Sequence, residues 1–156
     1  MLYAFQFFMV LTLVLYTGTF ANYLTFFLTG GVKSEKLARP LLLGTMAVHL
    51  LGLISLAVLR GHVPITNRGE ALTTVVLGLV VVYFYLEHRT GEKNLGPFVL
   101  ALALILQGVS AMYIQQLHPA SPLLERRGFI LHALLTIFAY SSFFLAFVSS
   151  ALYLVL

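Results

Sequence analysis

The stretch RGHVPITNRGEAL, residues 60–72, separates two of the most apolar runs in the chain and decides how they are arranged. Asn67 and Glu70 within it have the spacing of a helix capping box, which marks the start of a helix. Pro64 fixes the turn before that helix, because proline is disfavoured inside a helix. The stretch therefore predicts two antiparallel helices joined by a short folded connector.

The composition places both helices in a membrane. Of the 156 residues, 60% are hydrophobic and 9% are charged, whereas about 25% are charged in a soluble domain. A bilayer core takes about 20 apolar residues as a helix. Long unalternating runs of this kind occur at about residues 3–28, 41–59, 71–86, 98–114 and 129–156. The sequence thus predicts an all-α, single-domain membrane protein with five transmembrane helices in an antiparallel bundle. Glu70 and Glu87, at the two ends of the third helix, are expected to snorkel towards water.

Charge and residue usage exclude several classes of function. The net charge of +4 comes from short connectors and is too dispersed for a nucleic-acid interface. The chain has no cysteine, so disulfides, cysteine-based metal sites and covalent attachment of haem through C-x-x-C-H are excluded. The first twenty residues lack a basic n-region and an A-x-A cleavage site, so they are expected to be a retained helix rather than a signal peptide.

The lysines and arginines of the connectors suggest an orientation. Five lie on one face of the predicted bundle and four on the other, which favours the first face as cytoplasmic and the N-terminus as outside. The five are Lys33, Lys36, Arg39, Arg89 and Lys93, and the four are Arg60, Arg68, Arg126 and Arg127. All four outer residues are arginine, which is suited to bidentate contacts with carboxylates or phosphates. Contact with lipid headgroups is the alternative reading of these arginines.

Three histidines are candidates for function, and the other two, His88 and His118, are expected to be solvated. His49 falls inside the second predicted helix, and an intramembrane histidine is a functional hypothesis by default. Its alternative is a hydrogen bond to Gln107, Asn22 or a nearby serine. His62 lies in the connector, where a solvated polar residue is the simpler reading. His132 opens a row of small residues on the fifth helix, a pattern typical of close helix packing in lipid; that row is His132, Ala139, Ser142, Ala146 and Ser149.

Residues 47–72 resemble the second transmembrane helix and following loop of the cytochrome c assembly family, the CcsA, ResC and HemX type of haem-handling membrane protein. The family pattern is H-x-x-G-L followed by G-H-x-P-[LIV]-[ST]-[ND]-x-x-E-[SA]-L. Matching positions are His49, Gly52, Leu53, Gly61, His62, Pro64, Ile65, Thr66, Asn67, Glu70, Ala71 and Leu72. A looser match in the fifth helix comprises His132, Tyr140, Ser141 and Ser149. The resemblance covers most of the chain from about residue 41 onward.

The chain also departs from the family pattern. Family members continue into a tryptophan-rich external segment that cradles haem, and this chain has no tryptophan. We therefore expect either the N-terminal part of a longer protein or a short relative without the synthase half. No nucleophile or paired carboxylates stand out, so the chain is not expected to be an enzyme alone.

The resemblance implies haem b as cofactor, with His49 and His132 as candidate iron ligands. His62 and the outer arginines, Arg60, Arg68, Arg126 and Arg127, would then contact the haem and its propionates. His49 is expected about 15 Å deep and His132 roughly 5 Å deep at about 1.5 Å per residue. A depth difference of ~10 Å means that the two should not ligate one iron. A shared outer site would require the second and fifth helices to be neighbours at their outer ends.

The sequence therefore predicts a haem-handling integral membrane protein of the cytochrome c assembly family that holds or delivers haem towards the outer face. The alternative is a structural subunit of a larger respiratory or photosynthetic membrane complex that keeps the fold without haem. A third reading, a b-type cytochrome subunit, conflicts with the depth mismatch unless a partner supplies a ligand. We expect other membrane subunits and lipid as partners, and a bacterial inner membrane as the location.

Overall fold

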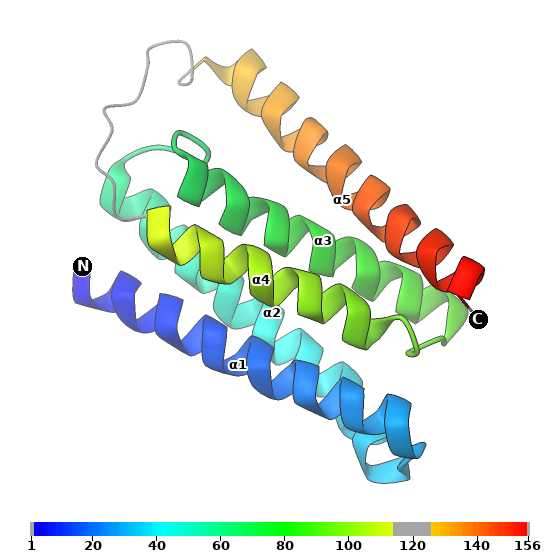
Figure 1. The fold of residues 1–156 in the computed structure, drawn as a ribbon. Coiled ribbons are helices and arrows are strands. Elements are labelled where there is room, and N and C mark those ends of the chain that lie inside the picture. Colours follow the sequence, from blue (N-terminus) through cyan, green and yellow to red (C-terminus); the bar gives the residue numbers. More distant parts are fainter. Residues whose placement is uncertain (1, 114–125, 156) are drawn as a thin grey trace.

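The computed structural model describes residues 2–113 and 126–155, and that part of the chain is a bundle of five α-helices. The helices are α1 (Leu2–Thr29), α2 (Val32–Arg60), α3 (Arg68–Thr90), α4 (Gly96–Tyr113) and α5 (Arg127–Val155). Each is long and apolar enough to cross a membrane. Successive helices run in opposite directions (Figure 1). The predicted all-α fold with five membrane-spanning helices is confirmed.

The boundaries differ most at the start of α2. The sequence predicted a helix from residue 41, with Pro40 as a breaker in the connector, but α2 begins at Val32 and includes Pro40. Proline inside a helix removes one backbone hydrogen bond and crowds the carbonyl four residues before it, yet α2 continues through Pro40. The eight residues before it are helical and carry Lys33, Glu35, Lys36 and Arg39. The second helix thus extends beyond its apolar run.

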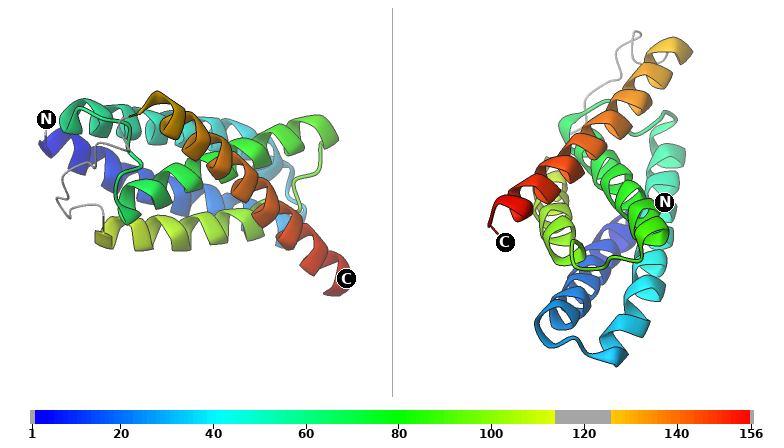
Figure 2. Two further views of the ribbon diagram at one scale, coloured as in Figure 1. Left: turned by 90° about the horizontal axis from the view of Figure 1, so that it is seen from above. Right: turned by 90° about the vertical axis from the view of Figure 1, so that its right-hand side faces the viewer.

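The helices pair in a fixed order that places α5 at the edge. α1 packs on α2 and α4, and α3 packs on α4 and α5, whereas α2 and α3 make fewer contacts. Figure 2 shows α5 crossing the outside of the α3–α4 pair, with its C-terminal part leaning away from the bundle. The connector 60–68, the end of α4 at Tyr113 and the start of α5 at Arg127 lie at one end, called the His62 end below. The connectors 29–32 and 90–96 lie at the other, called the Arg39 end.

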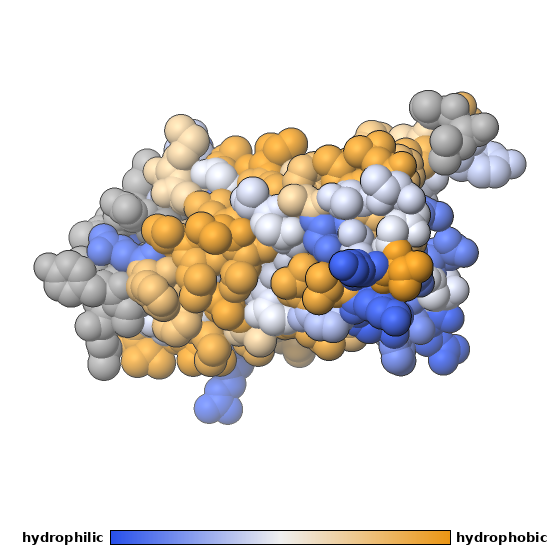
Figure 3. All heavy atoms as spheres, turned by 90° about the horizontal axis from the view of Figure 1, so that it is seen from below, coloured by the Kyte–Doolittle hydropathy of each residue, from blue (hydrophilic) through white to orange (hydrophobic). Residues whose placement is uncertain are grey.

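The apolar core lies between α1, α2, α3 and α4. Its largest fully buried side chains include Tyr16, Tyr23, Tyr83, Leu42 and Leu100. Figure 3 shows an apolar surface over most of one face of the bundle, with hydrophilic side chains gathered at the Arg39 end. This arrangement is expected for a bundle surrounded by lipid, with its charged residues at the ends.

The packed face of α5 differs from the predicted one. His132, Ala139, Ser142 and Ala146 of the predicted row are exposed. The helix is instead buried through Ile137, Ser141 and Leu145. The cause is Gly78 of α3, because a Cβ there would lie 2.8 Å from Ser141 Oγ and 3.3 Å from Ile137 Cγ2. The small residue that lets the helices approach therefore lies on α3.

Candidate functional site

The connector at the His62 end is folded around a buried carboxylate. Asn67 is the N-cap of α3, and its Oδ1 accepts a hydrogen bond of 2.8 Å from the backbone N–H of Glu70. Glu70 Oε2 accepts bonds from the Thr66 N–H at 2.9 Å and the Thr66 hydroxyl at 2.6 Å. The predicted helix cap is therefore confirmed, but the prediction that Glu70 snorkels to water is wrong, because its side chain is fully buried.

Arg60 is part of this folded connector. Its Nε lies 3.8 Å from Glu70 Oε1, and its side chain is only 13% exposed. Gly61 ends α2 in the left-handed region, with φ of 73°, a conformation that favours glycine. The carbonyl of the buried Pro64 accepts a 2.8 Å bond from the Thr74 hydroxyl and so ties the connector to α3. Arg60 thus provides the charge partner of an internal carboxylate.

The other predicted residues at this end are more accessible. Arg68, Arg126, Arg127 and His132 are exposed. His62 is half-buried, and its Nδ1 lies 3.0 Å from the carbonyl oxygen of Val63. If that bond is donated by Nδ1, Nε2 of His62 keeps a lone pair for a ligand.

The second and fifth helices are not direct neighbours, so that prediction is wrong. α5 packs on α3, which lies between it and α2. At the His62 end, residues of α2, α3 and α5 together line an apolar groove of about 240 Å³. The groove is lined by Leu53, Ile54, Ala57, Val63, Pro64, Thr74 and Leu134. Val63 and Pro64 follow His62 in the sequence and Leu134 lies two residues after His132, but neither histidine lines the groove.

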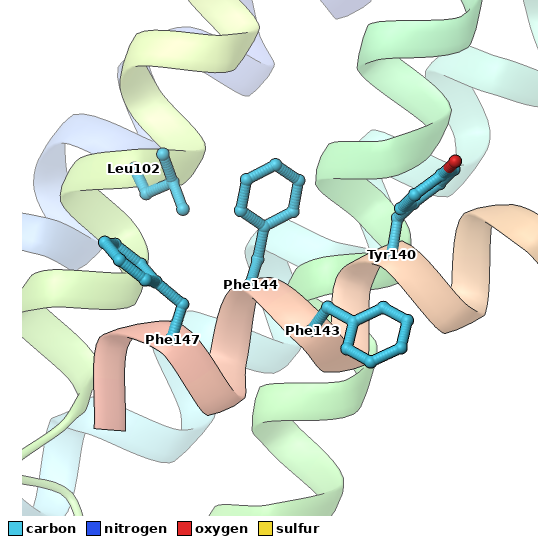
Figure 4. A pocket seen from close by; sticks show the side chains of 5 residues that line it. All are labelled: Leu102, Tyr140, Phe143, Phe144 and Phe147. Atoms are coloured by element: carbon cyan, nitrogen blue, oxygen red, sulfur yellow. The ribbon is translucent and has the colours of Figure 1, made fainter. Parts of the chain in front are cut away.

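A larger apolar groove of about 480 Å³ lies between α4 and α5. Its lining residues are Leu102, Tyr140, Phe143, Phe144 and Phe147. Figure 4 shows Phe144 and Phe147 on the side of α5 that faces Leu102. Tyr140, which is part of the looser family match, lines this groove rather than the His62 end.

His49 lies in the core, where it is 2% exposed. Its Nδ1 is 2.9 Å from the Tyr16 hydroxyl of α1, and its Nε2 is 2.8 Å from the Thr73 hydroxyl of α3. The Thr73 hydroxyl donates in turn to Gln107 Oε1 of α4 at 3.0 Å. Because Thr73 has one hydroxyl proton and Gln107 receives it, Nε2 of His49 donates and Nδ1 accepts. Both nitrogens are thereby occupied.

Comparison with curated proteins finds relatives of the CcsA and HemX type. A cytochrome c biogenesis protein CcsA from Trieres chinensis is 24% identical over 103 residues, which is 64% of this chain and 33% of the relative. CcsA from Heterosigma akashiwo is 29% identical over 97 residues, or 60% of this chain and 30% of the relative. Protein HemX from Brevibacillus brevis is 28% identical over 152 residues, or 92% of this chain and 53% of the relative.

The chain resembles CcsA-type cytochrome c biogenesis proteins. It spans about a third of the length of the CcsA relatives and about half of HemX. No family model matches the chain, and no solved structure matches it. The resemblance to the CcsA and HemX type that the motifs suggested is therefore confirmed.

A second polar cluster lies at the Arg39 end of the bundle. The sequence motifs did not predict it. The Glu87 carboxylate is fully buried and accepts a 2.6 Å bond from the Tyr23 hydroxyl, while Arg39 Nε lies 3.4 Å away. The prediction that Glu87 snorkels is therefore wrong. Tyr23, Arg39 and Glu87 come from three helices and share no motif. The only sequence signal for this cluster was a glutamate at the end of an apolar run.

His88 does not take part in the hydrogen bonds of either cluster. His88 is exposed, as expected for a solvated residue, and stacks on Phe84 with ring centroids 6.2 Å apart. His118 was expected to be solvated too, but it lies outside the described residues. Within residues 2–113 and 126–155, no three side chains of His, Cys, Asp or Glu are grouped so as to hold a metal ion.

Proposed function

We propose that this chain is a haem-handling membrane protein of the CcsA and HemX type, which holds or passes haem at its His62 end. The observation that carries the proposal is the groove between α2 and α5, because its lining draws on both sequence-matched segments, with Val63 and Pro64 from one and Leu134 from the other. The relatives named cytochrome c biogenesis protein support a role in the same process.

The residues at this end have distinct parts in the proposal. Haem would bring an iron centre, an apolar ring edge and two propionates. The groove offers an apolar surface, and His62 and His132 are accessible imidazoles at the same end of the bundle. Arg68, Arg126 and Arg127 are exposed and suited to hold carboxylates through charge-assisted bonds. Arg60 acts indirectly, by holding the connector through Glu70.

His49 does not fit the same role in this structure. Iron ligation needs a free lone pair on a ring nitrogen, and the two nitrogens of His49 are engaged by hydroxyl groups. Neither groove is lined by His49. We therefore assign the haem contacts to the His62 end alone.

The proposal is tested by titrating haemin into the purified protein and recording reduced-minus-oxidised spectra. Binding with a Soret band and α and β bands is expected. It should weaken in His132→Ala and in the double variant Arg126→Gln/Arg127→Gln. His88→Ala, at the opposite end, is the matched control. A flat visible spectrum, or equal weakening in the control, would refute haem handling at this end.

The second candidate is a structural subunit of a larger membrane complex that keeps the CcsA-type fold without haem. Two observations favour it: the hydrogen-bonded state of His49 and the exposed aromatic face of α5. The haemin titration separates the two candidates, since a structural subunit should give no specific Soret band while remaining folded.

A further inference from the structure

We infer that His49 is the centre of a buried hydrogen-bonded clasp that fixes the first four helices, and that it does not ligate haem iron in this chain. The clasp is defined as Tyr16, His49, Thr73 and Gln107. Each member comes from a different helix, in the order α1, α2, α3 and α4. The inference does not depend on the proposed function, because it follows from the core alone.

The clasp satisfies every polar group that it buries. Tyr16, His49, Thr73 and Gln107 are at most 2% exposed. Tyr16 donates to His49, His49 donates to Thr73, and Thr73 donates to Gln107. In lipid and in an apolar core no water can replace a lost partner, so breaking one bond leaves a costly unpaired group. These hydrogen bonds therefore determine which face of each helix packs into the core.

Close packing around the clasp leaves no room for a macrocycle. A Cβ at Gly52, one turn from His49 on α2, would lie 3.3 Å from Phe8 Cβ of α1. The Tyr16 ring meets the His49 ring edge to face, with centroids 5.6 Å apart. To free a ring nitrogen for iron, α1 or α3 would have to separate from α2. The chain of hydrogen bonds ends at Gln107, whose Nε2 lies 3.9 Å from Met9 Sδ, so within the described residues these bonds do not continue as a proton path to either end of the bundle.

The first test is thermal unfolding of the purified full chain in detergent. Thr73→Val and Tyr16→Phe keep the shape of each side chain and remove one hydroxyl. Each is expected to lower the Tm by about 2–4 °C, the shift for one lost bond in a chain of this size. Thr25→Val is the matched control, because Thr25 is exposed and bonds only within α1. An unchanged Tm in both clasp variants would overturn the inference.

The second test separates a clasp from an iron ligand. His49→Gln retains an acceptor and a donor, so it should keep a higher Tm than His49→Leu while both leave the haemin spectrum of the wild type unchanged. Adding Thr73→Val to His49→Leu should cost less than it does in the wild type, because the partner is already lost. A Soret shift or loss of haemin in both His49 variants, with normal binding in Thr73→Val, would overturn the inference.

Nuclear magnetic resonance of histidine labelled with nitrogen-15 reads the protonation pattern directly. We expect one signal pair of the Nε2–H tautomer that disappears in His49→Gln. A His49 signal of the Nδ1–H form would contradict the clasp. If the wild type binds no haemin, the proposed function fails, whereas the Tm and tautomer results still support or refute the clasp.

Discussion

At the scale of single residues, the buried carboxylates of Glu70 and Glu87 and the closely packed Gly96 determine how the helices pack. Glu70 and Glu87 are fully buried at opposite ends of α3. Each has an arginine partner from α2, Arg60 and Arg39 respectively. A buried charge is tolerated when it is paired and hydrogen-bonded, so each end of α3 is tied to α2 by a specific pair.

Glu70→Ala is expected to destabilise the protein by about 3 kcal/mol, because it removes a buried charge partner and two hydrogen bonds to Thr66. Asn67→Ala removes the helix cap and should cost about 1 kcal/mol. Arg68→Gln, at an exposed position, should change stability by less than about 0.5 kcal/mol. Unfolding of the three purified variants measures this order, and a Glu70→Ala cost no larger than that of Asn67→Ala would contradict it.

Gly96→Ala is expected to destabilise by about 1–3 kcal/mol, the usual cost of overpacking. A Cβ at Gly96 would meet the ring of Tyr23 and the hydroxyl of Tyr83. Gly108→Ala is the matched control on the same helix, since a Cβ there meets nothing within 4 Å. That change should be neutral or stabilise α4 by up to about 1 kcal/mol. Equal Tm values for the two variants would show that the close approach at Gly96 is absent.

At the scale of elements, the sequence was a good guide to what each helix is and a poor guide to which face it packs. Apolar run length predicted all five helices, because spanning a bilayer sets a minimum length. The cap at Asn67 followed from a local motif. The face of α5 did not, because small residues occur on two of its sides and Gly78, which selects the Ser141 side, lies on another helix.

The candidate site was likewise predictable where local sequence determines it and not where helix packing does. The residues of the connector were predicted from a contiguous motif, but the partners of His49 were not, since Tyr16 and Thr73 lie far from it in sequence. Gln107 was named as a possible partner and does join the cluster, through Thr73. Long-range pairing of this kind depends on helix rotation and order, which hydrophobic periodicity defines weakly when all sides of a helix are apolar.

Gly78→Leu is expected to displace α5 from α3, because the added side chain would occupy the space of Ser141 and Ile137. The Tm should fall by several degrees while the helix content of the variant remains close to that of the wild type. Gly44→Leu, at an exposed position of α2 where a Cβ meets nothing within 4 Å, is the control. A Tm loss of the same size in both variants would argue against a specific α3–α5 contact.

At the scale of the whole molecule, orientation in the membrane is a prediction from connector charge. We expect the His62 end outside, so Gly128→Cys should react with an impermeant thiol reagent added to intact cells, and Asn94→Cys should react only after lysis. Both positions are exposed, and the chain has no native cysteine, so each variant carries one thiol. The reverse labelling pattern would invert the orientation and place the proposed haem site on the cytoplasmic face.

The two buried carboxylates of α3 have a consequence for the lipid around the protein. At about 1.5 Å per residue, Glu70 and Glu87 are roughly 25 Å apart along the helix axis, which is less than the ~30 Å hydrocarbon core of a typical bilayer. Both carboxylates are fully buried, so the partly exposed charges beside lipid are their arginine partners, Arg39 and Arg60, which lie roughly 32 Å apart along α2. That spacing matches a typical bilayer, so the Tm in bicelles should be highest near a core of ~30 Å and fall in lipids whose acyl chains are much longer or much shorter.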